Sequence, residues 1–180
     1  MAIRDIVLFP NPVLTTRCPE VTEVTDEIVA LVNDMAETMY AAPGIGLAAP
    51  QIGELQRIFI IDISAGDQPN DLRVFINPEI LEKRGSITWE EGCLSFPGLY
   101  EKVQRSSYVR ARALDIRGQS FEIEAEELLA VAIQHEFDHI DGVVYLDRVS
   151  RLKRKLALKR YQKLQKAAEA ETESSEEDDE

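Results

Sequence analysis

Apolar positions recur every three or four residues in three parts of the chain, which is the spacing of one face of an α-helix. The first part follows Thr25 and ends before Pro43, the second covers residues 126–141, and the third covers about residues 150–168. We therefore expect an N-terminal helix, a middle helix and a C-terminal helix.

Other segments are compact apolar runs or alternate between apolar and polar residues, as strands do. The expected strands cover residues 57–63, 73–77, 80–89, 108–116 and 121–125. Pro78 is expected to stop the second of these, because proline cannot donate a hydrogen bond within a sheet. The last two alternate on both sides of a turn, which predicts a hairpin with one face in water.

The length of 180 residues suits one domain, and 44% apolar with 29% charged residues is typical of soluble globular proteins. No apolar run approaches the length of about 18 residues that a membrane span needs. The N-terminus carries Asp5 within a short apolar stretch and no cleavage site of small residues, unlike a secretory signal. We expect a cytoplasmic protein without a membrane contact.

Charge is unevenly distributed towards the C-terminus. Residues 169–180 carry eight acids and no base, so most of the net charge of −13 lies there. This predicts a disordered acidic tail behind a single domain of residues 1–168. Residues 148–166 hold nine bases and no acid. They are either a solvated basic helix face or a surface that docks a polyanion, and the tail could neutralise them.

The motif His135-Glu136-Phe137-Asp138-His139 lies inside the middle helix. Two histidines four positions apart leave one face of a helix, so both imidazoles can bind one ion while the acid beside them handles a proton. A lone histidine is more often a core or surface residue. The chain, however, has only two histidines and both fall in this motif, which favours a metal site.

Two histidines need a further protein ligand to complete a tetrahedral metal site. No glutamate lies between Glu136 and Glu169, and Asp147 remains an alternative. Asp141 is close to the motif but should point away from its metal face. Cys93 is the best remaining candidate, although a free cysteine alone would more often be a small buried residue. Cys18 has no expected role, and a cytosolic setting favours thiols over a disulfide.

A run of small residues from Gly44 to Ala49 precedes Pro50 and Gln51. It lacks the third glycine of a dinucleotide-binding motif and the lysine of a phosphate-binding loop, and it follows a helix where those motifs follow a strand. Small residues would instead let another backbone approach closely, for example an extended peptide.

With these ligands in view, the chain resembles the peptide deformylase family over nearly all of its length to about residue 165. Three motifs carry the resemblance: residues 44–51 (GIGLAAPQ), 91–95 (EGCLS) and 135–139 (HEFDH). The resemblance implies an α+β fold, with antiparallel and mixed β-sheets around a central metal-binding helix and with an N-terminal and a C-terminal helix. It also implies removal of the formyl group from N-formylmethionyl nascent peptides, with release of formate.

The resemblance further implies that Cys93, His135 and His139 bind one divalent metal ion together with one water. Fe²⁺ is the native metal typical of the family, and Zn²⁺ or Ni²⁺ is often found in preparations; thiolate and imidazole suit all three. Glu136 would transfer the proton. The Gln51 side-chain amide and the Leu94 backbone N–H would stabilise the oxyanion.

The nascent peptide would lie as an extended strand along Gly44, Ile45 and Gly46. The candidates for the pocket of the methionine side chain are Ile45, Trp89, Leu128 and Val131. Glu91 and Arg105 would pair behind the ligands and support them.

The resemblance also implies that the basic C-terminal helix contacts the ribosome, without sequence-specific recognition of nucleic acid. The acidic tail is the main departure from the usual family pattern.

Two rival hypotheses are a metallopeptidase that cleaves internal amide bonds and a non-catalytic binding protein. Gln51 and Glu136 argue against the second, because a pure binder needs neither.

Overall fold

The computed structural model describes residues 2–64 and 70–177, with the backbone alone described for 172–177. The helices within this part of the chain are α1 (Asp26–Ala41), α2 (Glu127–Ile140) and α3 (Arg151–Glu177). The strands are β1 (Gly46–Ala48), β2 (Ile58–Ile61), β3 (Arg73–Arg84), β4 (Ile87–Glu91), β5 (Glu101–Arg105), β6 (Tyr108–Leu114) and β7 (Ser120–Glu126). Short 3-10 helices are η1 (Pro12–Thr15), η2 (Ala49–Ile52) and η3 (Tyr145–Arg148).

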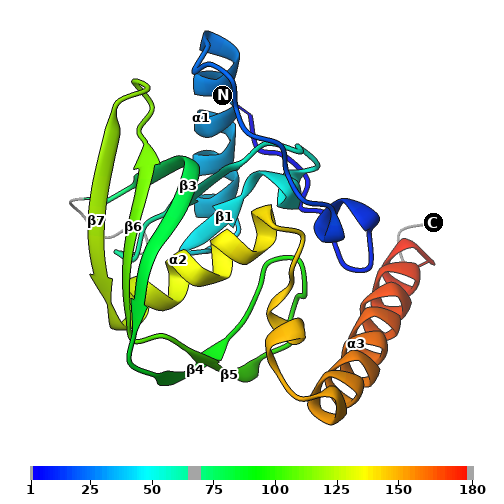
Figure 1. Cartoon of the computed structure of the whole chain (residues 1–180). Helices are drawn as coiled ribbons and strands as arrows, with labels where there is room; N and C mark the ends of the chain where they lie inside the picture. The colour runs from blue at the N-terminus through cyan, green and yellow to red at the C-terminus, as the bar shows by residue number, and fades with distance from the viewer. Residues whose placement is uncertain (1, 65–69, 178–180) are drawn as a thin grey trace.

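The strands form two sheets. Five strands pair in the order β1-β2-β3-β6-β7, and β4 pairs with β5 in a separate ribbon. Every described strand pair is antiparallel. Helix α2 lies against the larger sheet at the centre of the molecule, and α3 projects along one side (Figure 1). The expected α+β fold with its central helix is confirmed.

Strand β2 explains how the sheet holds two helices. Its side chains alternate: Ile58 and Ile60 pack in the cluster that contains residues of α1, whereas Phe59 and Ile61 pack in the cluster that contains residues of α2. All four are fully buried. A strand covered on both faces reads as a continuous apolar run, and each buried side chain contributes about 1.5–3 kcal/mol. The sheet thereby fixes the position of α2.

Strand β3 does not stop at Pro78, so that prediction is wrong. The strand continues to Arg84, and its register with β6 shifts between Ile76 and Glu79. Asn77 has φ +49° at this bulge, and its side-chain amide bonds both backbone groups of Val21. Because a bulge leaves a residue outside the ladder, proline is tolerated there.

Helix α3 packs through a few side chains only. Ala157 and Tyr161 join the cluster built around Phe96 and Tyr145, while Leu152 remains 68% exposed. The helix was expected to end near residue 168, but its backbone continues to Glu177. Part of the predicted acidic tail is therefore helical, and residues 178–180 lie outside the described residues. Among the described helices, none is both long and apolar enough to cross a membrane.

Candidate metal centre and substrate cavity

Helix α2 presents His135 and His139 one turn apart, and the loop after β4 brings Cys93 to them. The Cys93 Sγ atom and one nitrogen of each imidazole all lie within 4.8 Å of one another. The Cys93 Sγ atom lies 3.3 Å from His139 Nε2. Both histidines are buried and Cys93 is half-buried. The structure thus brings together the three predicted ligands across 46 residues of sequence.

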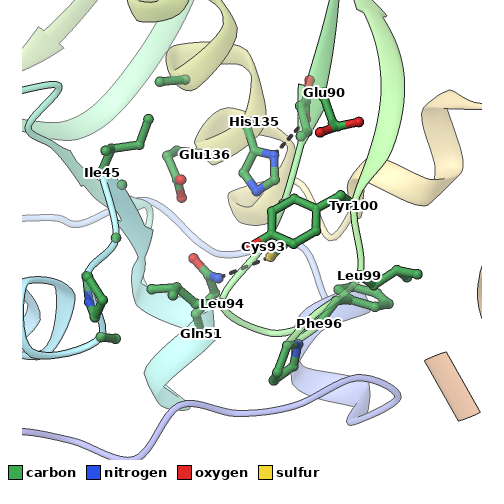
Figure 2. A pocket seen from close by; sticks show the side chains of 18 of the residues that line it. Ile45, Gln51, Glu90, Cys93, Leu94, Phe96, Leu99, Tyr100, His135 and Glu136 are labelled. Carbon is green, nitrogen blue, oxygen red and sulfur yellow. Dashed lines mark hydrogen bonds and ion pairs between the residues drawn. The ribbon is translucent and has the colours of Figure 1, made fainter. Parts of the chain in front are cut away.

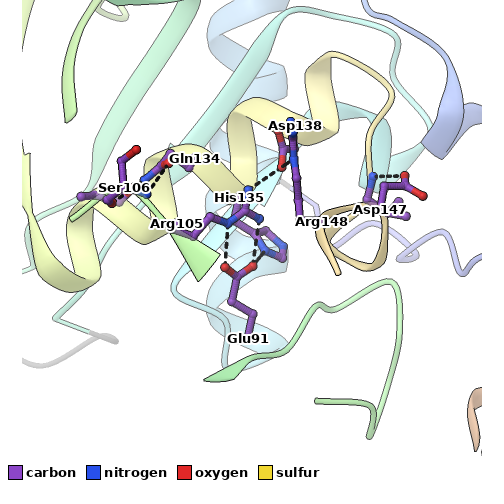
Figure 3. Close-up of polar contacts among 10 residues, drawn as sticks. Glu91, Arg105, Ser106, Gln134, His135, Asp138, Asp147 and Arg148 are labelled. Carbon is purple, nitrogen blue, oxygen red and sulfur yellow. Dashed lines mark hydrogen bonds and ion pairs between the residues drawn. The ribbon is translucent and has the colours of Figure 1, made fainter. Parts of the chain in front are cut away.

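A chain of charged groups lies behind His135 (Figure 3). Glu91 Oε2 lies 2.8 Å from His135 Nδ1. Arg105 donates from Nε and Nη2 to the two Glu91 oxygens, at 2.8 and 3.0 Å, and from Nη1 to Asp138 at 2.6 Å. Arg148 donates to both oxygens of Asp138. The predicted Glu91–Arg105 pair is therefore formed, and Glu91 lies against the ring of His135, where outer partners of metal ligands are found.

These charged groups and burial together shift the pKa values of Glu91 and the two histidines. Burial alone would raise the pKa of Glu91, but hydrogen bonds with His135 and Arg105 outweigh it and lower the pKa to about 2. Burial alone would also lower the pKa of His135, yet its hydrogen bonds with Cys93 and Glu91 raise it. Burial and the neighbouring His135 lower the pKa of His139 well below its usual value. His139 is then a neutral imidazole, the form that binds a metal.

Glu136 lies between the ligands and strand β1. Its carboxylate is buried, and its Oε2 atom has no hydrogen-bond partner among the described residues. Burial raises the pKa of Glu136 to about 7. A Cβ atom on Gly46 would collide with Glu136 Oε1, so glycine is required where this strand passes the carboxylate. A carboxyl group with this pKa suits a proton acceptor and donor at neutral pH.

Gln51 approaches the ligands from η2, the 3-10 helix that follows β1. Its Oε1 atom accepts from the Ala48 backbone N–H at 2.9 Å, which is the turn geometry of η2. Its Nε2 atom lies 3.2 Å from Ser95 Oγ and 3.5 Å from Cys93 Sγ. Figure 2 shows the Gln51 amide pointing at the Cys93 sulfur, near His135 and Glu136. The turn therefore orients an amide donor towards the metal centre.

The donor set fits one divalent transition-metal ion. One thiol and two imidazoles are ligands that iron, zinc and nickel share. The unpartnered Glu136 oxygen beside them can hydrogen-bond to a further ligand of the ion. Cys18 lies away from these donors, in the core cluster with Phe59 and Ile133, and burial raises the pKa of its thiol to about 11.

A cavity of about 460 Å³ opens in front of two of the three ligands, Cys93 and His135. Its size lies within the range of small-ligand pockets. All six residues predicted to bind substrate line it: Gly44, Ile45, Gly46, Trp89, Leu128 and Val131. Glu136, Gln51 and Leu94 line it as well. The predicted substrate-binding residues, two metal ligands and the Glu136 carboxylate therefore line one cavity.

Comparison with known proteins identifies the family. The family model for polypeptide deformylases matches residues 3–155. The chain belongs to this family. A peptide deformylase of Acidobacterium capsulatum is 51% identical over 94% of this chain and 99% of its own. The crystal structure of a Legionella pneumophila peptide deformylase superposes with a TM-score of 0.88 at 42% identity, covering 93% of this chain and 98% of its own.

A deformylase of Synechococcus elongatus, solved in complex with actinonin, gives a TM-score of 0.84 at 38% identity and covers 87% and 86% of the two chains. As a member of the polypeptide deformylase family, the chain described here is a metal-dependent hydrolase. It removes the formyl group from N-terminal formylmethionine of newly made polypeptides and releases formate.

Sequence reasoning missed several residues of the deformylase site. Tyr100 packs against Gly92, where a Cβ atom would clash with its ring, and it lies beside Cys93 at the cavity (Figure 2). Its side chain is 61% exposed, and no pattern in the sequence marks it. Asp138 and Arg148 were also missed as partners of Arg105. The position of Asp138 inside the motif was the only available signal.

Proposed function

We propose that Glu136 transfers the proton during deformylation. The observation that carries this role is the buried Glu136 oxygen beside the three ligands, which has no partner in the part of the chain that the structure describes. Glu136 would accept a proton from the attacking water and return it to the leaving amine of the peptide. Burial raises its pKa to about 7, so the group can perform both transfers near neutral pH.

Cys93, His135 and His139 would hold the ion, which we propose is Fe²⁺ in the native enzyme. A divalent ion at this site supplies Lewis-acid activation of water and of the formyl carbonyl. Glu91 accepts the Nδ1 hydrogen of His135 and leaves Nε2 of that ring for the ion. Zn²⁺ and Ni²⁺ would fit the same donors.

The developing oxyanion would receive hydrogen bonds from Gln51 and from the Leu94 backbone N–H. The Gln51 amide is held by Ala48 and Ser95 before any substrate arrives. Donors that are already in place stabilise the transition state without reorganisation.

The peptide would bind as an extra strand beside β1. This strand is the edge of the larger sheet, since β2 is its only neighbour in the described sheet. Gly44, Ile45 and Gly46 line the cavity along the free side, so backbone hydrogen bonds are available to an extended chain. Ile45, Trp89, Leu128 and Val131 would surround the methionine side chain.

We also propose a cytoplasmic location, because the substrate is a newly made polypeptide. The basic part of α3 would contact the ribosome. Residues 1–168 would be the catalytic domain, and the acidic residues 169–180 would weaken that contact. Truncation after Ala168 should strengthen ribosome binding and increase its dependence on salt. Equal affinity with and without these residues would show that they do not weaken docking.

Formate release from formyl-Met-Ala-Ser tests the proposal. The metal-loaded chain should release formate, leave an unformylated peptide intact and lose activity as the Glu136→Gln variant. Cleavage of the unformylated peptide would support a metallopeptidase instead. No formate from metal-loaded protein would indicate a non-catalytic protein, and full activity of the variant would exclude the role of Glu136.

A further inference from the structure

A second depression, of about 290 Å³, lies apart from the substrate cavity. The end of β3, the turn before β4, the end of β5, helix α2 and η3 all contribute to it. It is lined by Lys83, Gly85, Ser86, Gln104, Arg105, Ser106, Gln134 and Arg148. No residue lines both cavities. Its lining is polar and contains three cations but no acid, in contrast to the apolar walls of the substrate cavity.

The positive charge of this depression is only partly neutralised. Arg105 and Arg148 share the carboxylate of Asp138, and Glu91 is the other acid within the network. Three cations therefore face two carboxylates, and both carboxylates lie behind the lining. Lys83 pairs with Val109 through its backbone in the β3–β6 ladder, and its ammonium group has no hydrogen bond or ion pair with any described residue. Each guanidinium has five N–H donors, so several point to no acceptor.

Neutral donors surround the cations. The Gln104 amide donates to Ser86 Oγ at 2.8 Å, which leaves the Ser86 hydroxyl hydrogen free to donate onward. Gln134 bonds both backbone groups of Ser106, so the position of that serine is fixed. Its hydroxyl is a further donor at the wall. The depression thus combines positive charge with hydroxyl groups around a small volume.

We propose that this depression binds a small free oxyanion of the phosphate class, held by Lys83 and Arg148 together with the hydroxyls of Ser86 and Ser106. Such an anion accepts several charge-assisted hydrogen bonds at once and supplies the missing negative charge. A cation finds no carboxylate in the lining, and an apolar ligand finds little apolar surface.

The titration of Lys83 supports this choice. Burial lowers the pKa of Lys83, and the charges of Arg148 and Arg105 lower it further, while Asp138 and Asp141 act in the opposite direction. An anion between Lys83 and Arg148 relieves the repulsion between these cations. Arg105, which forms the floor, also holds Glu91 behind the metal ligand His135. The anion would therefore lie beside Arg105, which is joined through Glu91 to the metal ligand His135.

Calorimetric titration of the full, metal-loaded chain with inorganic phosphate tests the proposal. Wild type should bind one phosphate, and Lys83→Gln should weaken binding by about tenfold or more, the effect of one charge-assisted contact. The matched control is Lys159→Gln, which makes the same charge change on an exposed residue of α3 outside the depression. Its affinity should stay within about twofold of wild type, because distant exposed charges are screened.

Three outcomes would overturn the proposal. The first is equal binding by the Lys83 and Lys159 variants. The second is competition between phosphate and formyl-Met-Ala-Ser in formate release, which would place the anion in the catalytic cavity. The third is tighter binding of AMP than of phosphate, which would identify a nucleotide rather than a free anion as the ligand. Ser106→Ala, which keeps every charge, should weaken phosphate binding by a smaller factor and leave formate release unchanged.

Discussion

The two sides of helix α2 are hydrogen-bonded very differently. On the face that carries the metal ligands, His135 meets Glu91, but Glu136 Oε2 and His139 Nδ1 are buried without partners among the described residues. On the other side, Asp138 accepts from two arginines, and Gln134 bonds Ser106 and the Ala130 carbonyl. One helix thus carries reactive groups on one face and the network that holds it in place on the other. Changes on the two faces should therefore have different effects.

The largest effect is expected from the cavity side. Glu136→Gln should lower formate release by about 10²–10⁴-fold, because it removes the proton acceptor. Metal content should persist, and the free energy of unfolding in urea should not fall, since the variant removes a buried carboxyl of which one oxygen has no described partner. A large loss of stability would show that this side also holds the helix.

The network side should respond in stability. Glu91→Gln should lower the free energy of unfolding by about 3 kcal/mol at neutral pH, because it removes one of the two carboxylates that pair with the buried Arg105. The pKa of Glu91 is lowered to about 2 from 4.5, so its contribution is complete above pH 4.5 and disappears as pH falls towards 2. Urea unfolding of both proteins with a chelator present measures this. A gap that stays constant with pH would contradict it.

The same variant tests the support of His135. It should bind metal more weakly, by about 10–100-fold, as losses of such outer partners do. Unchanged metal content and activity would remove the proposed supporting role of the pair.

Gly46→Ala tests the tight fit between β1 and Glu136. A methyl group there collides with Glu136 Oε1 and must displace the carboxylate. Misplacement of this size should lower formate release by about 10²-fold while the three ligands keep their metal. Activity close to that of wild type would show that the strand moves aside.

The smallest effect is expected far from α2. Arg112 and Glu122 form an exposed ion pair at 2.7 Å on the hairpin of β6 and β7. Arg112→Gln should change the free energy of unfolding by less than about 1 kcal/mol, because exposed pairs contribute little. This change serves as the baseline for the loss of unfolding free energy in Glu91→Gln. A comparable loss in both variants would show that the buried network behind α2 contributes no more to stability than the exposed hairpin does.

The sequence predicted those parts of the molecule in which local pattern decides the structure. The three helices, the hairpin before α2 and the motif of His135 and His139 all follow from spacing along the chain. Cys93 became the best candidate for the third ligand because the chain has no further histidine and no glutamate between Glu136 and Glu169. The small residues around Gly46 were predicted to let another backbone approach closely. In the structure Gly46 lines the cavity, but the group that a Cβ atom there would meet is the Glu136 carboxylate.

The sequence did not predict features that depend on distant contacts. Strand β3 passes Pro78 because Asn77 finds its partners on Val21, 56 residues earlier. Arg148 reaches Asp138 only once η3 has folded back towards α2. Tyr100 lies at the cavity because Gly92 leaves room for its ring. None of these contacts has a periodic pattern.

A comparison of the two cysteines tests the central claim, that Cys93 completes the metal site on α2. Cys93→Ala should lose both bound metal and formate release from formyl-Met-Ala-Ser. Cys18→Ala, a change in the buried thiol away from the site, should keep both. Metal analysis and the formate assay on the two purified variants give the answer. Full metal content and activity in Cys93→Ala would contradict the claim.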